Sequence, residues 1–234
     1  MTDIPKYNHV IFTGLIGILA ATLTGAGEFL LHFSDAGNYA DDGKYEFLLN
    51  VPEWRQTWGH FLGVLGAPLY LVGMWHIYLG LRPFNQTIAF ILFLISSYGF
   101  VVGAVWIGSR AGIILLVQAN AASPMETFQI LIDYYVLHSE SLLQVVRTTT
   151  LLTSLGFIFM VLSGKTLYPR WMALLNPIIL LLLSFVLFWV APSLGKYALP
   201  TALNIGYFLF FTISTMQLAW FCKQHHQEKK YEDL

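Results

Sequence analysis

Six apolar stretches run through this chain of 234 residues, and each is long enough to cross a bilayer as a helix. A spanning helix needs about 20 mostly apolar residues, because the hydrocarbon core of a bilayer is about 30 Å thick. The stretches cover residues 10–32, 57–81, 86–108, 139–162, 172–191 and 201–221. We therefore predict an all-α, polytopic integral membrane protein, with one transmembrane domain of six helices and a tail at 222–234.

The charge content excludes the main classes of soluble protein. Only 11% of the residues are charged, whereas a soluble domain carries about 25%. With 12 Lys and Arg and a net charge of −1, the chain has no basic surface for nucleic acid. A single cysteine, Cys222, excludes an intrachain disulfide and a cysteine-based metal cluster. The partners that this composition predicts are membrane lipids.

The basic residues gather on one side of the predicted topology. They follow the second span, the fourth span and the last span, at Arg82, Lys165, Arg170, Lys223, Lys229 and Lys230. Lys and Arg in short connections mark the cytoplasmic side, so we predict an inner-membrane protein with both termini in the cytoplasm. The external side receives residues 109–138, whose apolar segments are too short to span. Such segments are typical of interfacial helices or re-entrant pieces that could cover an external cavity, and of the two we predict short interfacial helices.

Glycines stand four residues apart in two of the spans, at Gly59 and Gly63 and at Gly99 and Gly103. This GxxxG spacing lets helix backbones approach closely. We favour close packing inside one chain, and a homodimer through these Gly-rich helix faces is the alternative.

Ionisable side chains within the predicted spans gather in the external half. Glu28, His32 and Asp35 share one face of the first span, at positions i, i+4 and i+7. The same spacing recurs in the fourth span. The full set adds Thr57, His60, Arg110, His138, Glu140, Gln144, Arg147 and Asn204. Because ionisable groups inside a bilayer are costly, they usually face a cavity or one another, and we predict a polar cavity at this depth.

Several of these side chains also have a structural interpretation. Arg147 fits the role of an ion-pair partner for a carboxylate such as Glu28. Thr57 fits an N-cap of the second helix, and His60 fits a buried histidine bonded to a carbonyl. Outside the cluster, His76 lies about 24 Å from His60 along the same helix. We expect His76 to be a polar residue at the cytoplasmic interface.

Three chemistries fit the cavity. A bis-histidine haem would need His60 to face His32 or His138, and it is the least favoured because the inner side offers no second pair for electron transfer across the membrane. A divalent metal such as Zn²⁺ takes imidazole and carboxylate ligands, and its ligands would be Glu28, His32 and His60. A metal-free acid–base or nucleophilic site needs a histidine oriented by a carboxylate, with a hydroxyl or an anion-binding group beside it. The candidate catalytic residues are Glu28, His32, His60, His138, Arg147 and Thr57.

The charges of the cluster do not balance, because three carboxylates face two arginines. A low dielectric penalises such an imbalance. We expect a protonated histidine, either His32 or His60, a protonated carboxyl group or a bound cation to supply the missing positive charge.

Two short patches resemble a known family. Trp54, Arg55 and Thr57 open the second span, and His138 opens the fourth. This placement resembles the androgen-induced membrane hydrolases of fatty-acid esters, in which a threonine and a histidine so placed are the catalytic pair. The resemblance implies ester hydrolysis with Thr57 and His138 as that pair.

The off-centre cavity and the apolar segments that could cover it favour a membrane-embedded enzyme acting on a lipid or a hydrophobic small molecule, by hydrolase-like or metal-assisted chemistry. A small-molecule transporter or ligand-binding protein is the alternative, and a structural membrane protein is a third. The transporter is less favoured, because the chain shows no internal repeat.

Overall fold

The computed structural model describes residues 5–34 and 45–232, and these residues form helices and no strand. The α-helices are α1 (Tyr7–His32), α2 (Glu53–Gly66), α3 (Tyr70–Leu81), α4 (Gln86–Ala122), α5 (Glu126–Leu162), α6 (Pro177–Val190), α7 (Pro192–Ala198) and α8 (Ala202–Glu232). Four short 3-10 helices connect them: η1 (Tyr45–Leu48), η2 (Ala67–Leu69), η3 (Arg170–Leu175) and η4 (Leu199–Thr201). Asp35, a candidate of the polar cluster, lies outside the described residues.

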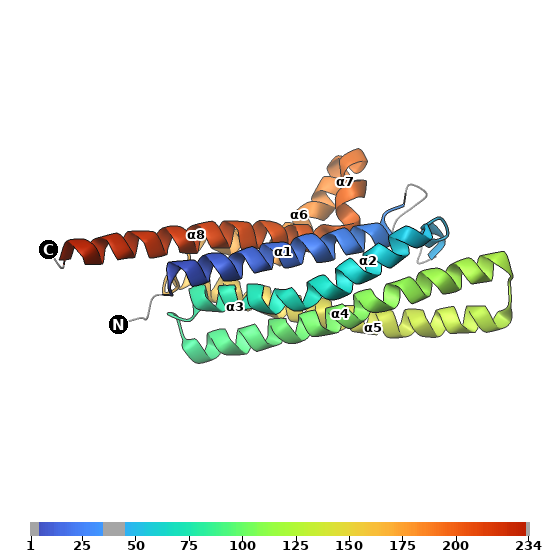
Figure 1. The fold of residues 1–234 in the computed structure, drawn as a ribbon, viewed down its shortest axis with the longest axis horizontal. Helices are drawn as coiled ribbons and strands as arrows, with labels where there is room; N and C mark the ends of the chain where they lie inside the picture. The colour runs from blue at the N-terminus through green and yellow to red at the C-terminus, as the bar shows by residue number, and fades with distance from the viewer. Residues whose placement is uncertain (1–4, 35–44, 233–234) are drawn as a thin grey trace.

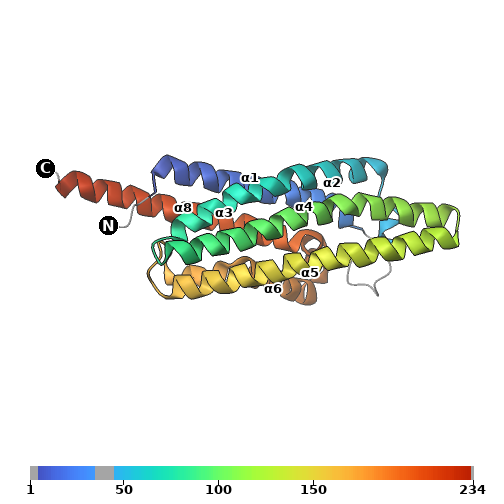
Figure 2. The same ribbon diagram turned by 90° about the horizontal axis from the view of Figure 1, so that it is seen from below.

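The long helices run side by side as an elongated bundle (Figures 1 and 2). Helix α1 packs against α2, α3 and α8, while α4 packs along α5. Helices α2 and α3 follow one another through η2 as one bent helical segment. The bend lies at Pro68, which has no backbone N–H to donate a helical hydrogen bond. The N- and C-termini lie at the same end of the bundle (Figure 1). The placement of both termini in the cytoplasm stays a prediction.

In the described part of the chain, five helices are long and apolar enough to cross a membrane: Tyr7–His32, Glu53–Leu81, Gln86–Ala122, Glu126–Leu162 and Pro192–His226. They correspond to five of the six predicted spans. The predicted span at 172–191 differs, because it divides into η3 and the 14-residue helix α6. Asn176 caps the start of α6 and Pro192 opens the next helix. At 1.5 Å per residue, α6 is about 21 Å long, which is shorter than the bilayer core.

The prediction of separate interfacial helices at 109–138 is wrong. Helix α4 continues without a break to Ala122, and α5 begins at Glu126. Each has 37 residues, about 55 Å, so the pair extends as a hairpin beyond the other helices (Figure 2). The physical reason is that Ser123 and Pro124 are the first residues in this region to stop a helix.

Glycines bring α1 and α2 into backbone contact. A Cβ atom on Gly27 would lie 2.5 Å from the backbone nitrogen of Gly63 and 2.7 Å from the carbonyl oxygen of Gly59. A Cβ atom on Gly99 would meet the side chain of Thr149 on α5. These glycines therefore pack against helices of their own chain, which confirms the favoured interpretation. A homodimer remains a prediction for a measurement of assembly.

His76 is fully buried at the end of the bundle that holds the termini. Its Nε2 atom lies 2.9 Å from Ser214 Oγ, and its Nδ1 atom lies 3.1 Å from the carbonyl oxygen of Val10. Tyr168 joins the same network through a 2.8 Å bond to Ser214. His76 thus links α1, α3 and α8, and the prediction that it is an interfacial residue is wrong.

Candidate functional site

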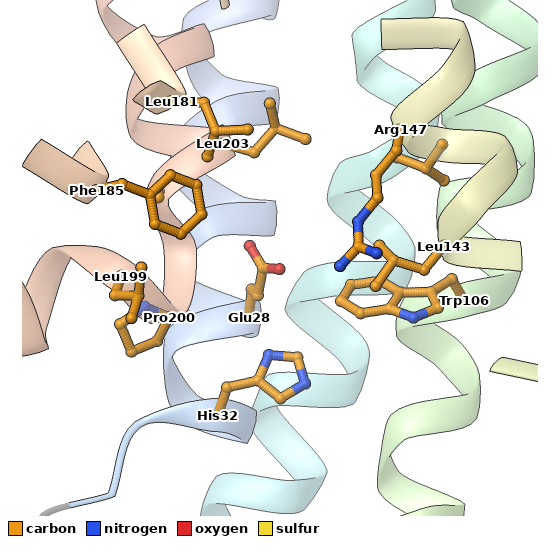
Figure 3. Close-up of a pocket in the computed structure, with 12 residues that line it drawn as sticks. Glu28, His32, Trp106, Leu143, Arg147, Leu181, Phe185, Leu199, Pro200 and Leu203 are labelled. Atoms are coloured by element: carbon orange, nitrogen blue, oxygen red, sulfur yellow. The ribbon is translucent and has the colours of Figure 1, made fainter. Parts of the chain in front are cut away.

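A cavity of about 340 Å³ lies between α1 and α8 on one side and α4 and α5 on the other. Glu28, His32 and Arg147 point into it (Figure 3). Its remaining walls are formed by Trp106, Leu143, Val146, Leu181, Phe185, Leu199, Pro200, Ala202 and Leu203. A largely apolar pocket with a few convergent polar groups is the usual form of a ligand site. The structure therefore brings together three of the residues selected from the sequence.

Glu28 is held one turn before the end of α1 by a side chain of α8. Asn204 Nδ2 donates a 2.6 Å hydrogen bond to Glu28 Oε2, and Tyr70 donates a 2.6 Å bond to Asn204 Oδ1. Because the Tyr70 hydroxyl occupies the amide oxygen, the amide nitrogen must face Glu28. Thr201 fixes the same region by donating to the carbonyl of Gly25. The carboxyl group of Glu28 is thus positioned by residues on three other elements.

His32 is fixed by a buried arginine on α4. Arg110 Nε donates a 2.8 Å hydrogen bond to His32 Nε2. A guanidinium nitrogen can only donate, so Nε2 accepts, the ring is neutral and its proton is on Nδ1. His32 is therefore not the protonated histidine that the charge imbalance led us to expect.

Aromatic rings enclose the charge of Arg110. Its Cζ atom lies 5.5 Å from the centre of the Trp106 ring and 5.4 Å from that of Tyr45. Tyr45 belongs to η1, which is anchored because Gln118 of α4 donates to the carbonyls of Leu48 and Val51. Among the residues that hold Glu28 and His32, Arg110 and Asn204 belong to the cluster predicted from the sequence, whereas Trp106, Tyr70 and Tyr45 do not. The only signal for these three residues in the sequence is that they are aromatic, and aromatic residues are abundant throughout this chain.

Arg147 differs from Arg110 because it bonds to no group within residues 5–34 and 45–232. It is exposed in the structure, and neither a hydrogen bond nor an ion pair joins it to Glu28 or Glu140, all three being described residues. Its guanidinium extends from α5 toward the space across from Glu28 (Figure 3). The structural ion pair considered from the sequence is therefore not formed.

The other predicted site residues lie outside the cavity lining. His60 sits between α2 and α4 near Gly108, with a buried Nδ1 atom that has no hydrogen-bond partner among the described residues. Thr57 and His138 are exposed on α2 and α5, and no hydrogen bond joins these two described residues. Within the described part of the chain, no three His, Cys, Asp or Glu side chains come close enough together to hold a metal ion. The set Glu28, His32 and His60 is thus not assembled.

Replacing Arg110 with methionine should lower the free energy of unfolding by about 1–3 kcal/mol, because His32 and Ser139 lose a buried donor. Thermal unfolding in detergent measures the effect. Arg170→Met is the control, since Arg170 lies in the connection before α6 and donates no hydrogen bond among the described residues. Equal unfolding temperatures for the two variants would contradict the role given to Arg110.

Residues 5–220 match the model of a family of unknown function, DUF6796. The chain belongs to this family. The match covers α1 to most of α8 and therefore includes every wall of the cavity. Neither a curated protein nor a solved structure matches the chain.

Proposed function

We propose that this member of DUF6796 is a membrane-embedded enzyme that acts on a lipid or a hydrophobic small molecule, with Glu28 as its general acid–base group. The observation that carries the proposal is the one carboxyl group among the residues that line this largely apolar cavity, held in place by Asn204. We place the protein in an inner membrane with both termini in the cytoplasm and the cavity in the outer half of the bilayer, which rests on the distribution of basic residues.

The geometry gives Glu28 and His32 complementary tasks. Glu28 accepts a proton from a hydroxyl group or a water molecule in the cavity and returns it to the product. His32 lies beside Glu28 as a neutral ring, because Arg110 donates to its Nε2 atom. A hydrolase-like reaction fits a carboxyl group that accepts and returns a proton beside a neutral imidazole. A metal-assisted reaction has less support, since the predicted ligands are not assembled.

Glu28→Gln should abolish turnover while the fold remains intact, since glutamine keeps the shape of the side chain and loses its basicity. We expect a loss of a hundredfold or more, the usual contribution of general acid–base catalysis. Lipid profiles of cells that lack or overproduce the protein identify the substrate, and the purified variant is then assayed on it. Glu53→Gln is the control, because Glu53 is an exposed carboxylate at the start of α2. Unchanged turnover in Glu28→Gln would refute the catalytic role.

A ligand-binding protein or transporter is the second candidate. The observation that favours it is that the twelve residues lining the cavity include no Ser, Thr or Cys that could act as a nucleophile. In this case the protein moves or retains its lipid without changing it chemically. The lipid whose amount changes in cells should then have an unaltered chemical structure. Glu28→Gln would then alter affinity and leave no reaction to lose.

A further inference from the structure

We propose that Arg147 binds the anionic headgroup, a carboxylate or a phosphate, of a single-chain amphiphile whose acyl chain lies along the apolar wall of the cavity. This inference rests on the proposed function in one respect, namely that the cavity is the substrate site. It adds the chemical class of the ligand and the residue that selects it.

The depth of Arg147 makes a partner necessary. The residue lies 15 positions before the end of α5 at Leu162, or about 22 Å along the helix axis. If the Leu162 end lies at one surface of a hydrocarbon core about 30 Å thick, Arg147 lies inside that core. A charged side chain at such a position is costly unless it is paired, yet Arg147 bonds to none of the described residues.

Arg147 has no counter-charge close to it in the cavity. Glu28 is the one carboxyl group among the lining residues, and the arginine whose charge acts on it is Arg110, not Arg147. His32 is neutral because Arg110 donates to it. A planar guanidinium binds carboxylates and phosphates through two parallel hydrogen bonds, so an anionic headgroup is its natural partner.

The walls near Arg147 suit an acyl chain that enters from the side. Leu143 and Val146 of α5 and Leu181 and Phe185 of α6 line the cavity, and Phe185 is 50% exposed. The side between α5 and α6 therefore reaches the molecular surface, and in a membrane that surface faces lipid. Helix α6 has only 14 residues and ends at Val190. It is therefore too short to cover the cavity across the full thickness of a bilayer.

Quenching of Trp106 fluorescence tests the proposal, because Trp106 lines the cavity. The protein is reconstituted in phosphatidylcholine vesicles and titrated with three dibrominated probes of equal chain length: stearate, stearoyl lysophosphatidate and stearyl alcohol. Quenching that disappears in Trp106→Phe reports binding in the cavity. We expect the two anions to bind about tenfold more tightly than the alcohol, the magnitude of one charge-assisted hydrogen bond.

Arg147→Gln should abolish this preference, and Arg147→Lys should keep part of it, because lysine retains the charge without the planar fork. Arg170→Gln is the control, since it removes the same charge outside the cavity. A stronger response to lysophosphatidate than to stearate identifies a lipid headgroup as the source of the anion, and the reverse identifies a free fatty acid.

The outcomes of these experiments distinguish a failure of this inference from a failure of the proposed function. If all three probes quench Trp106 equally in the unaltered protein, the headgroup proposal fails while the cavity remains a site for hydrophobic ligands. If no probe quenches Trp106, the cavity binds no acyl chain and both proposals fail. If anions bind through Arg147 but Glu28→Gln leaves turnover unchanged, the headgroup proposal stands and the catalytic proposal fails.

Discussion

Gly27→Ala should destabilise the protein by about 3 kcal/mol or more and displace the candidate site. The added Cβ atom would lie 2.5 Å from the backbone nitrogen of Gly63 and 2.7 Å from the carbonyl oxygen of Gly59. Backbone atoms cannot rotate aside as the end of a flexible side chain can, so α1 and α2 must separate. Because Glu28 follows Gly27 directly, its carboxyl group should move relative to Asn204.

Gly103→Ala is the matched control for this prediction. Gly103 lies in the middle of α4, where a Cβ atom would approach only a side-chain methyl group of Val146, at 3.7 Å. That distance is ordinary van der Waals contact, and alanine also has the higher helix propensity. We expect Gly103→Ala to unfold at or above the temperature of the unaltered protein, and Gly27→Ala far below it. Similar unfolding temperatures for the two variants would show that α1 and α2 are not held together by this backbone contact.

The fold could be predicted from the sequence where the signal is local. Apolar length located five spans, because each bilayer-crossing helix must satisfy its own backbone hydrogen bonds. The prediction was wrong where the length of an apolar stretch and the positions of the helix-breaking residues indicated different helix boundaries. The stretch at 172–191 is mostly apolar but is interrupted at Asn176 and Pro177, where α6 begins. The apolar segments within 109–138 are too short to span by themselves, yet the chain has no residue that ends α4 before Ala122.

The candidate site was predicted only in part, for a related reason. The i, i+4 spacing of Glu28 and His32 is a local feature, and both side chains do reach the cavity. Whether His60 of α2 reaches the same cavity depends on how α2 is rotated about its axis against α1 and α4. No short sequence pattern predicts that rotation. His60 consequently lies against Gly108. The arginine that fixes His32 comes from α4, 78 residues away.

The buried network around His76 could not be predicted from the sequence, although it is the main polar feature at the terminal end of the bundle. Each direction of hydrogen bonding in it follows from chemistry. The carbonyl of Val10 can only accept, so His76 Nδ1 carries the proton and Nε2 accepts from Ser214. Burial raises the pKa of the Tyr168 phenol well above its usual value, so Tyr168 remains protonated and donates to Ser214.

His76→Ala should therefore lower the free energy of unfolding by about 2–4 kcal/mol, because it leaves both a void and unpaired polar groups on two helices. The measurement is thermal unfolding in detergent, with His226→Ala as the control because His226 is exposed near the end of α8. Tyr168→Phe should cost less, since it removes one hydroxyl group and leaves the bond between His76 and Ser214 in place. If His76→Ala and His226→Ala unfold at the same temperature, the network is not what holds α1, α3 and α8 together. In that case the packing of apolar side chains such as Met74 and Phe211 would suffice at this end of the bundle.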